Sequence, residues 1–222
     1  MLRVGLTGSL GSGKTTVAAI LRERGLRVLE ADAIARAMME PGQEVFRGIV
    51  DHFGADVVRP DGSLDRPRLA ALAFSDGRLS ELNQIVHPPV VAEQERLSRE
   101  IFARDPAAIV VVESALIFEA EAWGTVPDWR KRFDRIILVT APDDLKIQRF
   151  LARILPTSAT AEERAAAERD ARQRLAAQLP DSVKIPQADF IIDNSGPFEA
   201  TRLQAERIAE ELRARLGTQA GD

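Results

Sequence analysis

Residues 8–15 read Gly-Ser-Leu-Gly-Ser-Gly-Lys-Thr and match the pattern G-x-x-x-x-G-K-[ST] at every fixed position. The apolar run Leu2–Thr7 comes before this stretch, and apolar residues at helical spacing follow it from Lys14 onward. Glycines in such a loop let backbone N–H groups converge on phosphate oxygens, and the N-terminus of the helix adds partial positive charge. A glycine-rich turn without a ligand is the alternative, but it leaves the agreement of the flanking segments unexplained. The stretch therefore predicts a phosphate-binding loop, or P-loop, in an α/β fold.

The same loop supplies the residues expected to hold a nucleoside triphosphate. Lys14 would reach the β- and γ-phosphates, and the hydroxyl of Thr15 would bind Mg²⁺. The predicted triphosphate-binding residues are Gly8, Ser9, Leu10, Gly11, Ser12, Gly13, Lys14, Thr15 and Thr16. Because the metal ion and Lys14 place positive charge locally, the chain as a whole does not need to be basic.

Five short segments have the composition of buried strands, with near-continuous apolar and β-branched residues. They are Leu2–Thr7, Leu26–Leu29, Ala108–Glu113, Arg135–Thr140 and Phe190–Asp193. Helical patterns separate them, and the order strand, helix, strand is typical of a parallel sheet. We therefore predict a five-stranded parallel sheet of the P-loop NTPase and nucleotide-kinase type, with helices on both faces and the ligand site at the carboxyl ends of the strands.

The helical segments are not evenly distributed along the chain. We expect one domain with a core formed by residues 1–40, 105–152 and 186–216. A helical insertion of about residues 41–104 interrupts this core, and a helical lid of about residues 153–185 follows the fourth strand.

Two carboxylates follow predicted strands and so lie at that edge. Asp32 comes directly after the second strand, where it would act as the base for an acceptor hydroxyl, order Mg²⁺ and its waters, or serve only as a helix N-cap. Glu113 ends the third strand, where it would hold a metal-bound water or remain a solvated strand-end carboxylate. The residues alone leave these alternatives open.

The chain has two histidines, His52 and His87, and a lone histidine is more often structural than functional. His87 precedes Pro88 and Pro89, which we expect to open a long helix that runs to about Ala103, because proline is tolerated in a first helical turn. Histidines and acids do not cluster at the spacing of zinc ligands. A zinc site is therefore not expected.

Three arginines are candidates for closing over the phosphates. Arg149 and Arg153 lie four residues apart on one face of a predicted helix, and Arg174 lies in the predicted lid. Planar guanidinium groups suit the charge that spreads over a phosphoryl group in transfer. The alternative for each is a solvated basic surface.

Composition excludes several classes of protein. The chain of 222 residues has no cysteine, a net charge of −4 and no basic stripe. Disulfides and thiolate metal sites are thus excluded, and nucleic-acid binding is not expected. Apolar runs stay well below the roughly 18 residues of a membrane span. We expect a cytoplasmic protein without membrane or nucleic-acid partners, as a monomer or small homo-oligomer.

The chain resembles the dephospho-coenzyme A kinase family in several motifs that occur in the family's order. The P-loop resembles G-G-I-G-S-G-K-[ST], and residues 28–36 (VLEADAIAR) resemble V-I-D-A-D-x-I-A-R. Further matches are Ile85–Pro88 to L-x-H-P, Glu113–Glu119 to D-x-P-L-L-F-E, and Arg174, Gln178, Lys184, Ala188, Asp189 and Ile192–Asn194 to the closing pattern R-x-x-x-Q, K, A-D, I-D-N. The resemblance covers about residues 2–196.

The resemblance implies transfer of the γ-phosphoryl group of ATP, with Mg²⁺, to the ribose 3′-hydroxyl of dephospho-CoA, the last step of coenzyme A synthesis. It implies two catalytic residues: Asp32, which would be the base, and Lys14. It also implies that the insertion binds the acceptor, with Asp32, Arg36, His87 and Pro88 as acceptor-binding residues. The metal would be held by Thr15 and, through water, by Glu113.

The chain departs from the family pattern at several positions. Glu30 replaces the usual aspartate, Ala115 replaces a proline, and residues 153–155 lack the usual Arg-Asp pair. The lid is longer than usual, and Trp123–Arg132 looks like an added loop. These differences concern the lid more than the reaction.

Two other functions remain as alternatives from the sequence. Another P-loop small-molecule kinase, acting on a nucleoside monophosphate or a sugar acid, would share the loop and the lid. A nucleotide-dependent switch would also share the P-loop, but a GTPase should carry an N-K-x-D motif, which this chain lacks. A screen of acceptors separates the kinases from one another, and acceptor-independent hydrolysis marks a switch.

Overall fold

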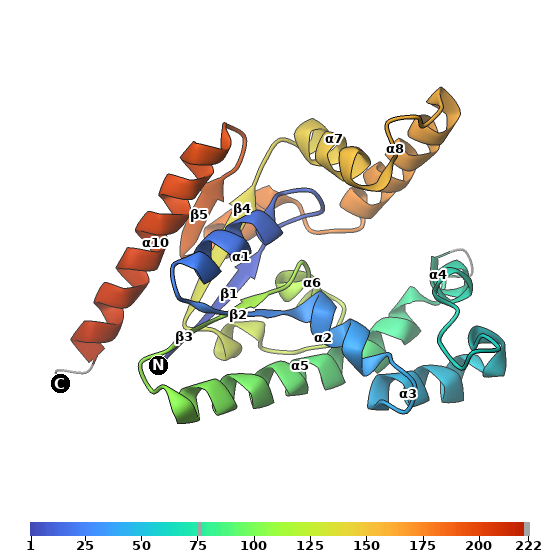
Figure 1. The fold of residues 1–222 in the computed structure, drawn as a ribbon, viewed down its shortest axis with the longest axis horizontal. Coiled ribbons are helices and arrows are strands. Elements are labelled where there is room, and N and C mark those ends of the chain that lie inside the picture. Colours follow the sequence, from blue (N-terminus) through green and yellow to red (C-terminus); the bar gives the residue numbers. More distant parts are fainter. Residues whose placement is uncertain (75–76, 220–222) are drawn as a thin grey trace.

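The computed structural model describes residues 1–74 and 77–219. Its centre is a parallel sheet of five strands in the order β2-β3-β1-β4-β5 (Figure 1). The strands are β1 (Leu2–Thr7), β2 (Arg27–Glu30), β3 (Ile109–Glu113), β4 (Arg135–Thr140) and β5 (Phe190–Asp193). The predicted five-stranded parallel sheet is therefore confirmed, with shifts of a residue at the ends of β2 and β3.

Helices cover both faces of the sheet, because alternate residues of its strands are buried on opposite sides. On one face, α1 (Lys14–Glu23) and α10 (Phe198–Gln219) pack on the sheet. The buried cluster on this face includes Leu6, Val111 and Ile137. On the other face, Val112 and Ile136 pack against α6 (Ile117–Ala122) and the turn η2 (Trp129–Arg132).

The helical insertion has a hydrophobic core of its own. Its elements are α3 (Glu44–Phe53), η1 (Ala55–Val57), α4 (Arg66–Phe74) and the long helix α5 (Leu79–Arg104), and α2 (Ala31–Met38) packs on them from the main body. Val45, Ile49, Leu64 and Val86 are among the residues buried in this core. The insertion is thus held to the sheet mainly through α2 and α5.

The prediction that Pro88 and Pro89 open the long helix is wrong. Helix α5 begins at Leu79, so that both prolines lie in its interior. Proline has no N–H to donate to the carbonyl four residues earlier, which weakens a helix at that turn. Val86 and Val90, one turn apart, are both buried against neighbouring elements, and this packing holds the helix together across the prolines.

A helical hairpin follows β4, and its second helix lies in the predicted lid of about residues 153–185. Helix α7 (Asp143–Ile154) packs against α8 (Ala161–Ala176) through Ile147, Phe150 and Ala171. The short helix α9 (Asp181–Lys184) and the turn η3 (Ile185–Gln187) then lead into β5. Figure 1 shows the lid helices and the insertion on the same side of the molecule. In the described part of the chain, no helix combines the length and the apolarity that a membrane span requires.

Candidate active site

The P-loop connects β1 to α1 and has the backbone geometry that its glycines allow. Gly11 and Gly13 have φ angles of 70° and 96°, in the left-handed region that glycine tolerates. A Cβ on Gly11 would lie 2.1 Å from the carbonyl oxygen of Lys146, and one on Gly13 would lie 2.0 Å from Nδ2 of Asn194. Both glycines are therefore required by close contacts with other elements as well as by the turn itself.

Side chains from distant parts of the chain hold this loop in place. Gln178 accepts a hydrogen bond from the backbone N–H of Leu10 at 2.9 Å, and Asp181 accepts one from the hydroxyl of Ser9 at 2.9 Å. On the other side, the amide of Asn194 donates to the carbonyl of Ser12 at 2.8 Å. The phosphate-binding loop is thus braced from the end of the lid and from the segment after β5.

Lys14 lies within the loop with its amine beside the predicted phosphate position. Its Nζ donates a hydrogen bond to the carbonyl of Ser9 at 3.3 Å. Burial lowers the pKa of Lys14 to about 8, although the carboxylates of Glu113 and Asp32 partly oppose this effect. The amine is therefore still mainly charged at neutral pH, and it lies among groups of both signs.

Thr15 and Glu113 form the pair that fits a hydrated magnesium ion. The hydroxyl of Thr15 donates to Oε1 of Glu113 at 3.3 Å, so that two oxygen donors face one another beside the P-loop. Burial raises the pKa of Glu113, and the nearby carboxylates of Asp32 and Glu30 raise it further. A carboxylate with a raised pKa is stabilised by a cation, and Mg²⁺ takes oxygen ligands together with water and phosphate.

Asp32 lies in the first turn of α2, where the N-cap position belongs to Glu30. The interpretation of Asp32 as a helix N-cap is therefore wrong. Among the described residues its carboxylate has neither a hydrogen bond nor a salt bridge, and the residue is exposed. Its charge acts on both Lys14 and Glu113. An unpaired carboxylate thus lies next to the P-loop lysine.

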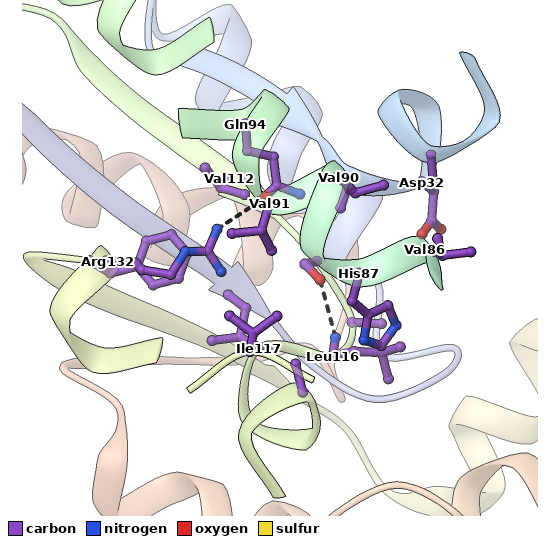
Figure 2. Close-up of a pocket in the computed structure, with 17 residues that line it drawn as sticks. Asp32, Val86, His87, Val90, Val91, Gln94, Val112, Leu116, Ile117 and Arg132 are labelled. Atoms are coloured by element: carbon purple, nitrogen blue, oxygen red, sulfur yellow. Dashed lines mark hydrogen bonds between the residues drawn. The ribbon is translucent and has the colours of Figure 1, made fainter. Parts of the chain in front are cut away.

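An apolar cavity of about 170 Å³ extends from Asp32 between α5 and the segment before α6 (Figure 2). Figure 2 shows Asp32 and His87 at one end of this cavity and Gln94 and Arg132 at the other. Its remaining lining is mostly aliphatic and consists of Ala31, Ala35, Val86, Val90, Val91, Val112, Ser114, Ala115, Leu116, Ile117, Ala120, Val126 and Phe133. Of the predicted acceptor-binding residues, Arg36 and Pro88 do not line it.

His87 is fixed at this cavity by two contacts with the added loop. Its ring is stacked on that of Trp123, with centroids 6.2 Å apart, and its Nδ1 lies 2.8 Å from Oγ1 of Thr125. Because the Thr125 hydroxyl donates to the carbonyl of Ala120, it must accept from Nδ1–H of His87. Burial lowers the pKa of His87. The ring is therefore neutral at pH 7, with Nε2 as a hydrogen-bond acceptor.

Two of the three predicted lid arginines lie beside one aromatic ring. The guanidinium groups of Arg153 and Arg174 lie 5.5 and 5.8 Å from the ring centroid of Phe150, and Arg174 also pairs with Asp170. Arg149 has a buried Nη1 without a hydrogen-bond partner in the described structure. The charge of Arg153 acts on Lys14. Arg153 is thus the lid arginine with a direct electrostatic link to the P-loop.

Two further lysines lie beside the P-loop. Lys184 was expected from the sequence as a lid residue, and Lys146 was not expected. Lys184, fully buried, lies 2.5 Å from Oε1 of Glu119. Lys146 pairs with Asp181, the residue that accepts from Ser9. Only four of the 30 basic residues are lysines, and three of these four surround the P-loop. Lysine is a compact point charge, so its selective use in an arginine-rich chain was a usable signal.

A braced P-loop, an unpaired carboxylate and an adjoining apolar cavity on a five-stranded parallel sheet define a P-loop kinase of small molecules. The sequence profile of one such family, dephospho-CoA kinase, matches residues 2–199. The chain therefore belongs to the dephospho-CoA kinase family.

Individual relatives agree with this assignment. A dephospho-CoA kinase of Corynebacterium efficiens is 38% identical over 217 residues, which cover 97% of this chain and 100% of the relative. The crystal structure of TT1252 from Thermus thermophilus has a TM-score of 0.70 and 32% identity, and covers 95% of this chain and 97% of its own. A dephospho-CoA kinase from Campylobacter jejuni shares the fold, with a TM-score of 0.62 at 21% identity over 96% of this chain and 97% of its own.

Proposed function

We propose that this chain transfers the γ-phosphoryl group of ATP to the ribose 3′-hydroxyl of dephospho-CoA, giving ADP and coenzyme A. The observation that carries the proposal is the position of Asp32, an unpaired carboxylate between the P-loop lysine and the apolar cavity. A phosphoryl group held at the P-loop and a hydroxyl at the cavity mouth would meet at this carboxylate. Family membership supplies the identity of both substrates.

On the donor side, the P-loop residues bind and orient the triphosphate. Backbone N–H groups of the P-loop that have no partner within the protein and the Nζ of Lys14 would contact its phosphate oxygens. Thr15 and, through water, Glu113 would hold Mg²⁺, which when bound neutralises charge on the phosphates. Arg149, Arg153 and Arg174 of the lid would contact the transferred group, and their planar donors suit its three oxygens.

On the acceptor side, Asp32 removes the proton of the 3′-hydroxyl as its oxygen forms the new bond to the γ-phosphorus. The bond between that phosphorus and the β–γ bridging oxygen breaks, so that ADP leaves and the proton remains on Asp32. His87 and the cavity walls orient the rest of the acceptor, while Arg36 and Pro88 lie on neighbouring turns outside the cavity lining. Positioning of this kind accounts for much of the rate in phosphoryl transfer.

The lining of the cavity argues against a sugar acid as acceptor. A carboxylate needs a cation that is free to pair with it, and the cation at this cavity, Arg132, already lies 3.3 Å from a carboxylate oxygen of Glu95. A neutral, largely apolar group fits the aliphatic walls better. This favours dephospho-CoA over the sugar-acid alternative.

The direct test is an incubation of the protein with ATP, Mg²⁺ and dephospho-CoA, with mass spectrometry of the products. Nucleoside monophosphates and sugar acids are run as competing acceptors under the same conditions. We expect coenzyme A and ADP in equal amounts. ATP hydrolysis that is indifferent to every acceptor would contradict the proposal.

The role of Asp32 is tested with Asp32→Asn, which keeps the shape of the side chain and removes its basicity. We expect turnover to fall about 10²–10⁴-fold, the scale of general base catalysis. Asp51→Asn, at an exposed carboxylate of α3 outside the cavity lining, is the matched control and should leave turnover unchanged. Turnover within a few fold of wild type for folded Asp32→Asn would remove Asp32 from the mechanism.

A further inference from the structure

The loop Trp123–Arg132, which the sequence predicts to be an addition, contributes two residues to the cavity wall. Trp123 and Thr125 fix His87, as described above, and Val126 and Arg132 line the cavity directly. The loop therefore contributes to the cavity at both ends. Its far end, where Arg132 meets Gln94 of α5, carries polar groups that the proposed reaction does not use.

Hydrogen-bond chemistry fixes the orientation of Gln94 at this end. Nη2 of Arg132 lies 2.9 Å from the side-chain oxygen of Gln94. Because a guanidinium has only donors, the amide oxygen of Gln94 must face Arg132, and its NH₂ group points the other way. Gln94 is 4% exposed, and in the described part of the chain its Nε2 has no hydrogen-bond partner. Figure 2 shows this nitrogen on the cavity side.

An amide nitrogen on a cavity wall, whose partner oxygen is already held by Arg132, is available to an acceptor atom of a bound molecule. Arg132 adds a second donor at the same place. Its side chain is 15% exposed, and its charge is already balanced by Glu95, with Nε 3.3 Å from Oε1. This Nε faces Glu95, while Nη2 of Arg132 donates to Gln94. The closed end of the cavity thus offers N–H donors and little uncompensated charge.

We propose that Gln94 and Arg132 form a donor pair that reads a ring nitrogen on the purine base of the phosphoryl acceptor. This inference rests on the proposed function and names the group that determines acceptor specificity. The base would enter the cavity with its ribose at the mouth, so that the sugar hydroxyl meets Asp32. The ring edge opposite the ribose, which carries N1 of adenine, then faces Gln94 and Arg132.

The alternative occupants fit this cavity less well. The diphosphate of the acceptor would need free cations, whereas the aliphatic walls and the Glu95-balanced Arg132 offer none among the lining residues. The pantetheine arm is separated from the ribose by that diphosphate, so it is not the part of the acceptor next to Asp32. A flat base between Val90 of α5 and Ile117 of α6 contacts apolar side chains on both faces.

The test uses Gln94→Glu, which keeps an oxygen for Arg132 and replaces the inward NH₂ donor with an acceptor. We expect the KM for dephospho-CoA to rise about 10- to 100-fold, the effect of losing one buried hydrogen bond, with the KM for ATP unchanged. Ser98→Ala is the matched control. Ser98 is buried on the same helix and its hydroxyl bonds the backbone of Gln94, but it does not line the cavity. Its KM values should equal those of wild type.

A second measurement changes the acceptor and leaves the protein intact. The 1-deazaadenine analogue of dephospho-CoA replaces N1 with C–H and keeps the shape of the base. Wild type should use it with a KM about 10- to 100-fold higher, whereas Gln94→Glu should no longer discriminate between the two acceptors. If Gln94→Glu does not fold, the wild-type comparison decides alone.

Three results would overturn the inference. They are a KM for dephospho-CoA within threefold of wild type in folded Gln94→Glu, equal use of both acceptors by wild type, and a parallel rise of the KM for ATP. If wild type turns over dephospho-CoA normally, any of these three results shows that Gln94 and Arg132 do not bind the base. The proposed function would still hold. Absence of all turnover by wild type overturns both.

Discussion

Lys14 and Lys184 lie beside the same P-loop, and they are held in opposite ways. Lys184 is fully buried, whereas Lys14 is half-buried. Lys184 has a permanent partner, Glu119, at 2.5 Å, and both side chains are buried. Within residues 1–74 and 77–219, the Ser9 carbonyl is the hydrogen-bond partner of the Lys14 amine, and burial lowers the pKa of Lys14 to about 8. The difference indicates that one charge is satisfied by the fold itself, while the other is kept for a ligand.

The surroundings of Lys184 support a structural role. Glu119, its partner in α6, also accepts a hydrogen bond from the backbone N–H of Leu179. The adjoining residues Gln178 and Asp181 hold the P-loop. The buried pair therefore fixes the segment from which the P-loop is braced, and its loss should affect folding before it affects chemistry.

The largest effect is expected from Lys184→Met, which leaves the charge of Glu119 buried without its partner. The free energy of unfolding should fall by about 3–5 kcal/mol, the usual cost of breaking a buried ion pair from one side. Urea denaturation measures this loss. The double variant Lys184→Met with Glu119→Gln should recover much of it, because no bare charge remains. A loss below about 1 kcal/mol in the single variant would refute the structural role.

Lys14→Met should show the reverse pattern. We expect turnover to fall about 10²–10³-fold, the cost of removing one preorganised donor from a transition state, with no loss in the free energy of unfolding. Steady-state kinetics and urea denaturation of the same preparation measure both. If Lys14→Met destabilises the protein as strongly as Lys184→Met does, the proposed contrast between the two lysines is wrong.

The smallest expected effect is a pH dependence of stability from Lys14. A lysine whose pKa is lowered by folding binds fewer protons in the folded state between about pH 8 and its ordinary value of 10.5, so that stability rises with pH in this window. The unfolding free energy of wild type minus that of Lys14→Met should therefore increase above pH 8, because only wild type gains stability there. The increase is at most about 1.4 kcal/mol per pH unit.

The composition makes this measurement clean, because the chain has no tyrosine and no cysteine to titrate in that range. The difference should be constant between pH 6 and 7, which serves as the internal control. A constant difference up to pH 10 would mean that Lys14 keeps its ordinary pKa in the folded protein.

The sequence predicted the sheet and the P-loop well, because these features are determined locally. Strands buried on both faces need continuous apolar runs, and the glycines of the P-loop have a fixed spacing. Asp32 and Glu113 were found because parallel strands bring their carboxyl ends to one edge. The roles proposed for these residues remain predictions.

What the sequence did not predict depends on contacts between distant segments. Asp181 meets Ser9 across 172 positions of the chain, and no local pattern encodes that pairing. The interior prolines of α5 are tolerated because of tertiary packing at Val86 and Val90, which local propensity does not describe. The orientation of Gln94 likewise follows from Arg132, which lies 38 positions away.

The separate hydrophobic core of the insertion has a consequence for how such a protein diversifies. Residues such as Val45, Ile49 and Leu64 pack with one another rather than with the cluster around Leu6 and Ile137. Substitutions inside the insertion can therefore accumulate without disturbing the nucleotide-holding half. Under the proposed function, a chain built this way can change which alcohol it recognises while its phosphate donor stays the same.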